Sequence, residues 1–262
     1  MKTFCFTVDD NIRFLRETVQ NQYASIFDHP YLSLYKRFHE KFGMKIQLNL
    51  FYKEQESDDF DLSQVPEHYR TQWEDCASWL KLSFHSRWNN EMPYAHSGYR
   101  EVYDHCQEVH REILRFAGPA SLAQTTTLHY CQTTDEGRQA LVDSGYRGLL
   151  GLFGSEENIH TSYSVPLEYC RDIFRGKPQT REGACVASID IVLNNHSEQS
   201  ILTQLQSMSH RQHVNVMIHE QYFYPDYRAY QPEFAQKLEA TFDYLCAHGY
   251  ESCFFEDYIG RK

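Results

Sequence analysis

Short apolar runs alternate with longer stretches of mixed polarity along the sequence. Apolar runs of this length, bounded by turn residues, predict strands buried on both faces. The predicted strands cover residues 2–8, 44–52, 79–85, 125–130, 146–153, 186–193, 214–219 and 252–255. Helices are predicted between them, over residues 11–42 with a break at Pro30, 66–76, 99–116, 135–144, 198–207 and 232–247.

This alternation of strands and helices predicts an α/β fold. Strands separated by helices form a parallel sheet with crossover connections. Seven or eight such units in 262 residues favour an irregular (β/α)7-8 barrel over an open sheet. Because no Pro/Gly/Ser-rich linker interrupts the pattern, residues 1–262 are predicted to form one domain. Residues 155–184 lack a clear period and are interpreted as an insertion.

Chemically active side chains follow several of the predicted strands. The first strand ends in Asp9 and Asp10, a pair that could simply form a turn and cap the next helix. Three later strands, however, end in a histidine, and another carries an aspartate close to its end: His85, His129, His219 and Asp190. Because the carboxyl ends of parallel strands meet on one face, we expect these side chains to converge on one pocket.

A carboxylate with several imidazoles is the ligand set of a catalytic Zn²⁺ or a similar divalent ion. Such an ion acidifies a bound water and polarises a carbonyl, while a neighbouring carboxylate and histidine transfer protons. Each residue also has an ordinary explanation. His85 could be a core histidine at a strand end, Asp190 a buried hydrogen-bonded carboxylate, and His96, His105 and His110 solvated side chains. Their joint placement is what favours a site.

Composition excludes some function classes. A charged fraction of 23% and an aromatic fraction of 15% are typical of a folded protein with a large core. The net charge of −11 argues against a sequence-independent grip on nucleic acid and against a polyanionic substrate.

The eight cysteines contain no C-x-x-C pair, which excludes a zinc ribbon and a thioredoxin-like motif. Cys5 and Cys253 lie in apolar runs and are interpreted as small buried hydrophobic residues. The apolar run before Asp9 is too short for a signal peptide, and no run reaches the length of a membrane span. We therefore expect a cytoplasmic protein in a reducing compartment.

Several of these segments resemble motifs of the polysaccharide deacetylase superfamily, carbohydrate esterase family 4. Thr7-Val8-Asp9-Asp10 resembles its T-F-D-D motif, whose first Asp is the catalytic base and whose second binds metal. Phe84-His85-Ser86 resembles its H-[ST]-x-x-x-H motif, and Ile218-His219-Glu220 its late L-x-H motif with the catalytic acid. The stretch from Leu128-His129-Tyr130 to Gly145-Tyr146-Arg147 is similar to the third motif region, and Gly249-Tyr250 to the usual ending. The resemblance runs in order over nearly the whole chain.

The resemblance implies a metal-dependent hydrolase that removes an acyl group, such as acetyl, from an amino sugar or glycoconjugate. It assigns Asp9 as base and His219 as acid, with a divalent ion, Zn²⁺ by preference, on Asp10, His85 and a third histidine. Substrate contacts are expected from four further residues: Tyr130, Asp190, Glu220 and Tyr222.

One departure from the family pattern is important. Asn89 stands where the second metal-binding histidine is expected. His129, which occupies the place of a family Arg, is the preferred replacement, with His96 or His219 as alternatives. The chain therefore resembles an atypical branch of the superfamily, and the expected cytoplasmic location suits intracellular glycan or glycoconjugate-precursor chemistry better than cell-wall trimming. Two other hypotheses remain: an inactive barrel that binds carbohydrate or a protein partner, and a metal-free glycosidase with Asp9 and Asp190 as its paired carboxylates.

Overall fold

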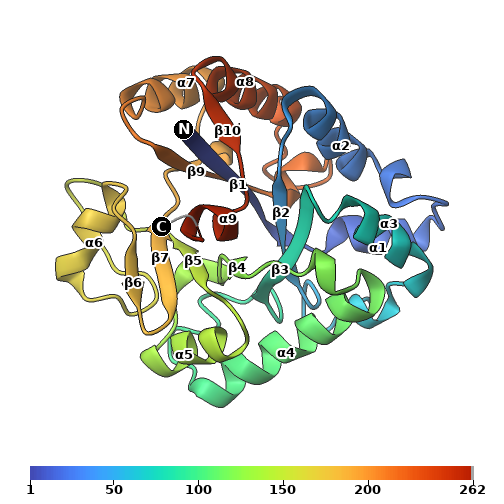
Figure 1. Cartoon of the computed structure of the whole chain (residues 1–262). Helices are drawn as coiled ribbons and strands as arrows, with labels where there is room; N and C mark the ends of the chain where they lie inside the picture. The colour runs from blue at the N-terminus through green and yellow to red at the C-terminus, as the bar shows by residue number, and fades with distance from the viewer. Residues whose placement is uncertain (261–262) are drawn as a thin grey trace.

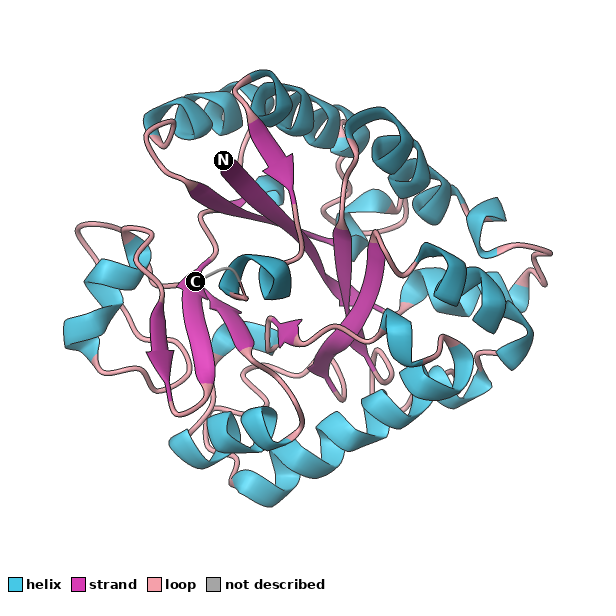
Figure 2. Ribbon diagram, viewed as in Figure 1, coloured by secondary structure: helices cyan, strands magenta, loops and turns pink. Residues whose placement is uncertain are grey.

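The computed structural model describes residues 1–260, and its strands form an inner layer with helices around the outside (Figures 1 and 2). The strands are β1 (Lys2–Asn11), β2 (Ile46–Phe51), β3 (Leu80–Ser86), β4 (Thr125–Thr126), β5 (Gly148–Gly151), β6 (Gln179–Arg181), β7 (Ala184–Ser188), β8 (Ile191–Val192), β9 (His213–His219) and β10 (Tyr250–Ser252). The α-helices are α1 (Arg13–Gln20), α2 (Pro30–Phe42), α3 (Arg70–Cys76), α4 (Tyr99–Phe116), α5 (Asp135–Asp143), α6 (Leu167–Phe174), α7 (Glu198–Ser207), α8 (Phe234–Ala247) and α9 (Phe255–Ile259). The predicted α/β class is confirmed.

The strands form two sheets. The first has the order β3-β2-β1-β9-β8, with β10 also paired to β1, and every pair in it is parallel. The second has the order β4-β5-β7-β6, and only β6 runs antiparallel to its neighbour. Parallel strands joined through helices are the arrangement that the alternating pattern predicts.

Side chains connect the two sheets where β3 approaches β4. The Ser83 hydroxyl donates to the Thr125 carbonyl oxygen at 2.8 Å. Tyr146, which precedes β5, places its hydroxyl oxygen 2.9 Å from the Phe84 amide nitrogen of β3 and 2.8 Å from His110 Nε2 of α4. The end of β3, which carries His85, is therefore held by the second sheet and by a helix.

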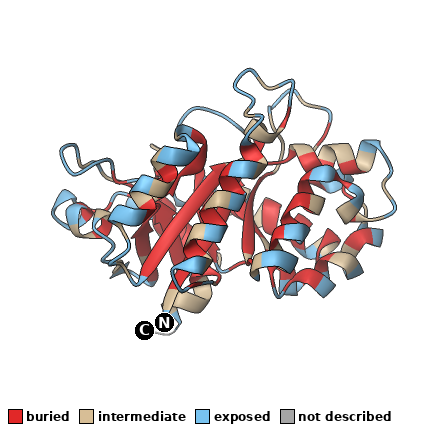
Figure 3. Cartoon of the chain, turned by 90° about the horizontal axis from the view of Figure 1, so that it is seen from above, coloured by how far each residue is buried: buried red, intermediate tan, exposed pale blue. Residues whose placement is uncertain are grey.

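Alternate residues of β1 enter two different cores. Phe4, Phe6 and Val8 belong to the large core that the helices share with both sheets, whereas Cys5 packs with Leu150 of β5 in a smaller cluster. This division follows from the period of two along a strand. Figure 3 shows the buried strands behind helices whose outer faces are exposed.

Three predicted strands differ in the structure. The apolar run 186–193 forms two strands, because the chain leaves the second sheet after β7 and enters the first at β8. Only Thr125–Thr126 of the predicted strand 125–130 pairs, and the run over 252–255 gives the end of β10 and the start of α9. A change of sheet keeps the residues buried, so apolar periodicity does not reveal it. Within 155–184 the chain forms α6 and β6, and no helix among residues 1–260 is long and apolar enough to cross a membrane.

Candidate metal centre

A bulge at the end of β1 brings Asp9 and Asp10 to the same cavity. Successive side chains of a regular strand point to opposite faces, so a regular β1 would separate the two carboxylates. The pairing of β1 with β2 shifts register between Val8 and Asn11, and Asp10 adopts a φ of +63°. Aspartate enters this left-handed region more readily than most residues. The bulge thus turns Asp10 toward the cavity that Asp9 also lines.

Asp10, His85 and His129 form a compact group of ligand atoms. Asp10 Oδ1 lies 3.0 Å from His85 Nε2 and 3.3 Å from His129 Nδ1, and the two nitrogens are 3.1 Å apart. His85 comes from the end of β3, and His129 from a short 3₁₀ turn, residues 129–131, that follows β4. His96, the alternative ligand, is exposed on a loop and does not belong to this group.

The protonation pattern of the group calls for a cation. His85 Nδ1 faces the Thr127 carbonyl oxygen, which can only accept, so this nitrogen carries the hydrogen. In a neutral ring, Nε2 then directs its lone pair at the Asp10 carboxylate, which is also an acceptor. Ligands about 2.0–2.1 Å from a tetrahedral ion are about 3.3–3.4 Å from one another. The three separations are close to that value, so the residues fit Zn²⁺ or a similar divalent ion.

Asp9 and His219 flank this group in fixed orientations. Asp9 is 2% exposed and accepts a hydrogen bond from Asn49 Nδ2 at 2.6 Å. Burial raises the pKa of Asp9 well above its usual value, although the Asn49 bond opposes the shift. The His219 Nδ1 atom lies 2.8 Å from Asn194 Oδ1, and burial lowers the pKa of His219 while the Asp10 charge opposes the change.

The charge of Asp10 is stabilised by its neighbours. Burial raises its pKa, but the His129 and His85 rings, which donate hydrogen bonds to the carboxylate when they are protonated, outweigh burial and hold the pKa of Asp10 well below its usual value. The second carboxylate oxygen, Oδ2, accepts from Gln221 Nε2 at 2.8 Å. A negative ligand is therefore maintained between two imidazoles.

These five side chains line one cavity of about 360 Å³. Its wall also includes Asn89, from the position where a second metal-binding histidine was expected. Tyr130 lines the rim and is 50% exposed, and Tyr227 and Arg228 complete the polar part of the wall. The cavity is thus bordered by acidic, basic and aromatic groups.

Glu220 and Tyr222, two residues predicted to contact substrate, do not line this cavity. The Glu220 carboxylate accepts hydrogen bonds from three main-chain amides at the start of α1, those of Ile12, Arg13 and Phe14. It borders only a smaller cleft of about 90 Å³. Tyr222 is partly buried and packs edge-on against Tyr227, with ring centroids 5.3 Å apart. These contacts favour structural roles for both residues.

Asp190 lies at the opposite end of the strands. It directly precedes β8, forms an ion pair with Arg211, and accepts from the Asn215 amide near the start of β9. His219 is the last residue of the same strand. The expectation that Asp190 ends a strand beside the histidines assumed that residues 186–193 form one strand, and the change of sheet moves it away.

The sequence prediction omitted the residues that orient the site. Asn49 alternates with Gln47 on the otherwise apolar β2, and both are at most 2% exposed. Buried polar residues at a spacing of two could have indicated a polar inner face. Asn194 and Gln221 lie in short 3₁₀ turns, where nothing in the sequence indicates that they reach the site.

Three solved structures are similar to this chain and identify its fold. A 4-α-glucanotransferase from Thermococcus litoralis has a TM-score of 0.60 and 13% identity over all of this chain, which spans 40% of that protein. A family 4 acetyl xylan esterase from Clostridium thermocellum, solved with a cobalt ion, has a TM-score of 0.52 and 11% identity over 98% of this chain and 89% of that one. A peptidoglycan N-acetylglucosamine deacetylase has a TM-score of 0.52 and 10% identity over 96% of this chain and 85% of that one.

No protein-family model matches the sequence. No curated protein matches it either. At the identities of the structural matches, the likeness shows the fold alone. The chain has a polysaccharide deacetylase-like fold, in agreement with the motif resemblance.

Proposed function

We propose that this chain, which has the fold of the polysaccharide deacetylases, is a metal-dependent hydrolase that removes an acetyl or similar acyl group from an amino sugar or glycoconjugate. The observation that carries the proposal is the group of Asp10, His85 and His129 in the cavity wall. Asp9 and His219 line the same cavity and have no place in that ligand set. Ligands and proton-transfer groups are therefore adjacent.

Each side chain has a distinct role in this proposal. Asp10, His85 and His129 would hold the ion, with Zn²⁺ preferred for its mixed nitrogen and oxygen ligands. When bound, the ion would polarise the acyl carbonyl and lower the pKa of a water. Asp9, oriented by Asn49, accepts the proton of that water, and His219, oriented by Asn194, donates a proton to the leaving group.

The cavity wall supports a carbohydrate ligand. Tyr130 exposes half of its surface at the rim, and Tyr227 lies nearby in the wall. Aromatic rings offer apolar faces to sugar rings, and the surrounding polar groups can bind hydroxyls. We further propose that the protein acts in the cytoplasm on an intracellular glycan or its precursor. The glycosidase hypothesis loses its support because Asp190, its second carboxylate, lies outside the cavity.

Metal analysis combined with an acetate-release assay tests the proposal. The protein is purified without chelators, its metal content is measured, and N- and O-acetylated sugars are assayed before and after metal removal and Zn²⁺ reloading. Asp10→Ala should lose both the ion of this cavity and acetate release, whereas Asp104→Ala, which alters an exposed carboxylate on α4, should retain both.

Two outcomes would contradict the proposal. An Asp10→Ala protein that keeps its full metal content in this cavity would refute the ligand assignment. A wild-type protein that binds sugar but takes up no ion at Asp10 would instead support the inactive carbohydrate-binding barrel.

A further inference from the structure

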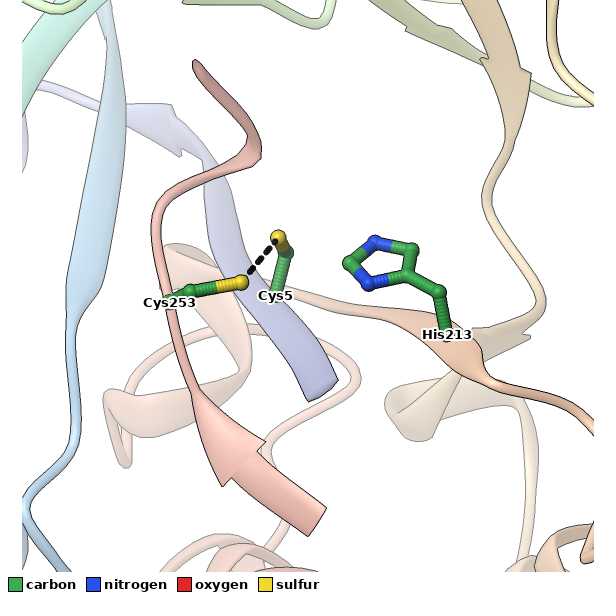
Figure 4. A group of neighbouring side chains, drawn as sticks. All are labelled: Cys5, His213 and Cys253. Carbon is green, nitrogen blue, oxygen red and sulfur yellow. Dashed lines mark hydrogen bonds between the residues drawn. The ribbon is translucent and has the colours of Figure 1, made fainter. Parts of the chain in front are cut away.

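A second group of metal-ligating side chains lies at the other end of the same two strands. Cys5 comes from β1, four residues before Asp9, and His213 begins β9, which ends in His219. Cys253 directly follows β10. One ligand atom from each of the three residues lies within 4.8 Å of the other two. Figure 4 shows the two sulfurs facing each other, with the His213 ring directed toward them.

The separation of the sulfurs suits a shared metal ion. Cys5 Sγ and Cys253 Sγ are 3.7 Å apart. A disulfide would require about 2.05 Å. Two thiolates about 2.3 Å from one tetrahedral Zn²⁺ are about 3.8 Å from each other. The two thiols, which share a hydrogen bond in the metal-free chain, are therefore already spaced as metal ligands are.

The His213 ring is held in place by contacts on several sides. Its Nδ1 lies 2.8 Å from Thr3 Oγ1, its Nε2 lies 2.9 Å from Asn215 Oδ1, and its face stacks on Tyr258 at 3.7 Å. A metal ion would replace one of these two hydrogen-bond partners. The other would keep the ring oriented, as is usual for histidine ligands.

The surroundings of the group favour a divalent ion. Cys5 and Cys253 lie in the smaller apolar cluster, where an uncompensated charge is costly. Two thiolates neutralise a divalent ion, whereas a monovalent ion would leave one negative charge.

We propose that Cys5, His213 and Cys253 form a structural Zn²⁺ site, separate from the catalytic proposal above. Only three residues of β10 pair with β1. The ion would link the segment after β10 to both β1 and β9, and so fix the approach to α9.

Cobalt substitution tests this site without interference from the first. The metal-free full chain is reduced and titrated with Co²⁺, and thiolate-to-cobalt charge-transfer absorption is followed in the near ultraviolet. The group at Asp10 offers only nitrogen and oxygen ligands, so the band should report the cysteine site alone. In His85→Ala, which lacks a ligand of the first site, the band should saturate at one Co²⁺ per chain. Cys5→Ser and Cys253→Ser should abolish the band.

Two matched variants separate this site from the proposed catalytic centre. His85→Ala should retain the band, and so should Cys131→Ser, which alters a buried cysteine of the first cavity. Loss of the band in Cys131→Ser but not in Cys5→Ser would overturn the assignment. So would a reduced wild-type chain that takes up Co²⁺ without any thiolate band, a measurement that does not depend on the variants folding. Failure of the hydrolase proposal would leave the band unchanged.

Discussion

Replacing Tyr146 by phenylalanine tests how the second sheet supports the end of β3. Tyr146 is 1% exposed, so Tyr146→Phe removes one buried oxygen atom and leaves the packing of the ring in place. That oxygen accepts from the Phe84 amide at 2.9 Å, and its proton is available to His110 Nε2 at 2.8 Å. The substitution therefore leaves a buried main-chain amide and a buried imidazole without this partner. Ser83, whose hydroxyl oxygen also lies 3.1 Å from the Tyr146 oxygen, keeps its hydrogen bond to the Thr125 carbonyl oxygen.

The expected cost follows from these two bonds. A buried donor left unsatisfied costs about 1–3 kcal/mol, and the lost bond to His110 adds about 1 kcal/mol. The substitution also removes the cost of burying the hydroxyl, which offsets part of this loss of stability. We expect the free energy of unfolding of Tyr146→Phe to fall by about 2–3 kcal/mol, with an unchanged denaturant m-value because the buried area is unchanged.

Urea denaturation at neutral pH, followed by circular dichroism and fluorescence, measures this change. Tyr230→Phe is the matched control, because Tyr230 is 37% exposed and the same atom is removed at the surface. The control should stay within about 0.5 kcal/mol of wild type. A Tyr146→Phe protein as stable as the control would refute the reasoning that this hydroxyl holds β3.

Three further predictions concern charge and substrate binding. Burial lowers the pKa of His110 to about 4, below its unfolded value, so its stabilising contribution is complete above about pH 6.5 and is lost as the pH falls toward 4. This amounts to about 3 kcal/mol, and His110→Gln should flatten the dependence of unfolding free energy on pH over that range. Asn49→Leu removes the donor to Asp9 and should raise the acidic pKa of the kcat/KM profile by about 1–2 units; an unshifted profile would contradict Asp9 as base. Tyr130→Ala should raise KM by about tenfold at unchanged kcat if the ring stacks on sugar, which steady-state kinetics would show.

The strand ends could be recognised from the sequence because each apolar run stops at a polar side chain. Asp9, Asp10, His85, His129 and His219 line one cavity, and parallel strands explain why they meet. The same reasoning misplaced Asp190. The strand before Asp190, β7, belongs to the second sheet, and the strand after it, β8, belongs to the first. Residues of both strands are buried, and burial alone does not indicate which sheet a residue joins.

Sequence patterns could not predict the bulge at Asp10 or the group of Cys5, His213 and Cys253. A register shift depends on the partner strand, which a single run of residues does not describe. Cys5 and Cys253 are 248 positions apart, so no local spacing identifies them as a pair. Both cysteines are buried, as the sequence interpretation expected, but that interpretation did not predict that they lie close to His213.

The central position of β1 in the first sheet has a consequence for the synthesis of the protein on the ribosome. β1 is made first, yet its pairing with β9 joins Thr3 to His213, 210 positions later in the chain. At about 5–20 residues per second, one edge of this apolar strand stays unpaired for roughly 10–40 seconds. An open strand edge is a template for aggregation. We therefore expect that slowing synthesis before β9 increases aggregation of newly made chains, because it prolongs the exposure of this edge.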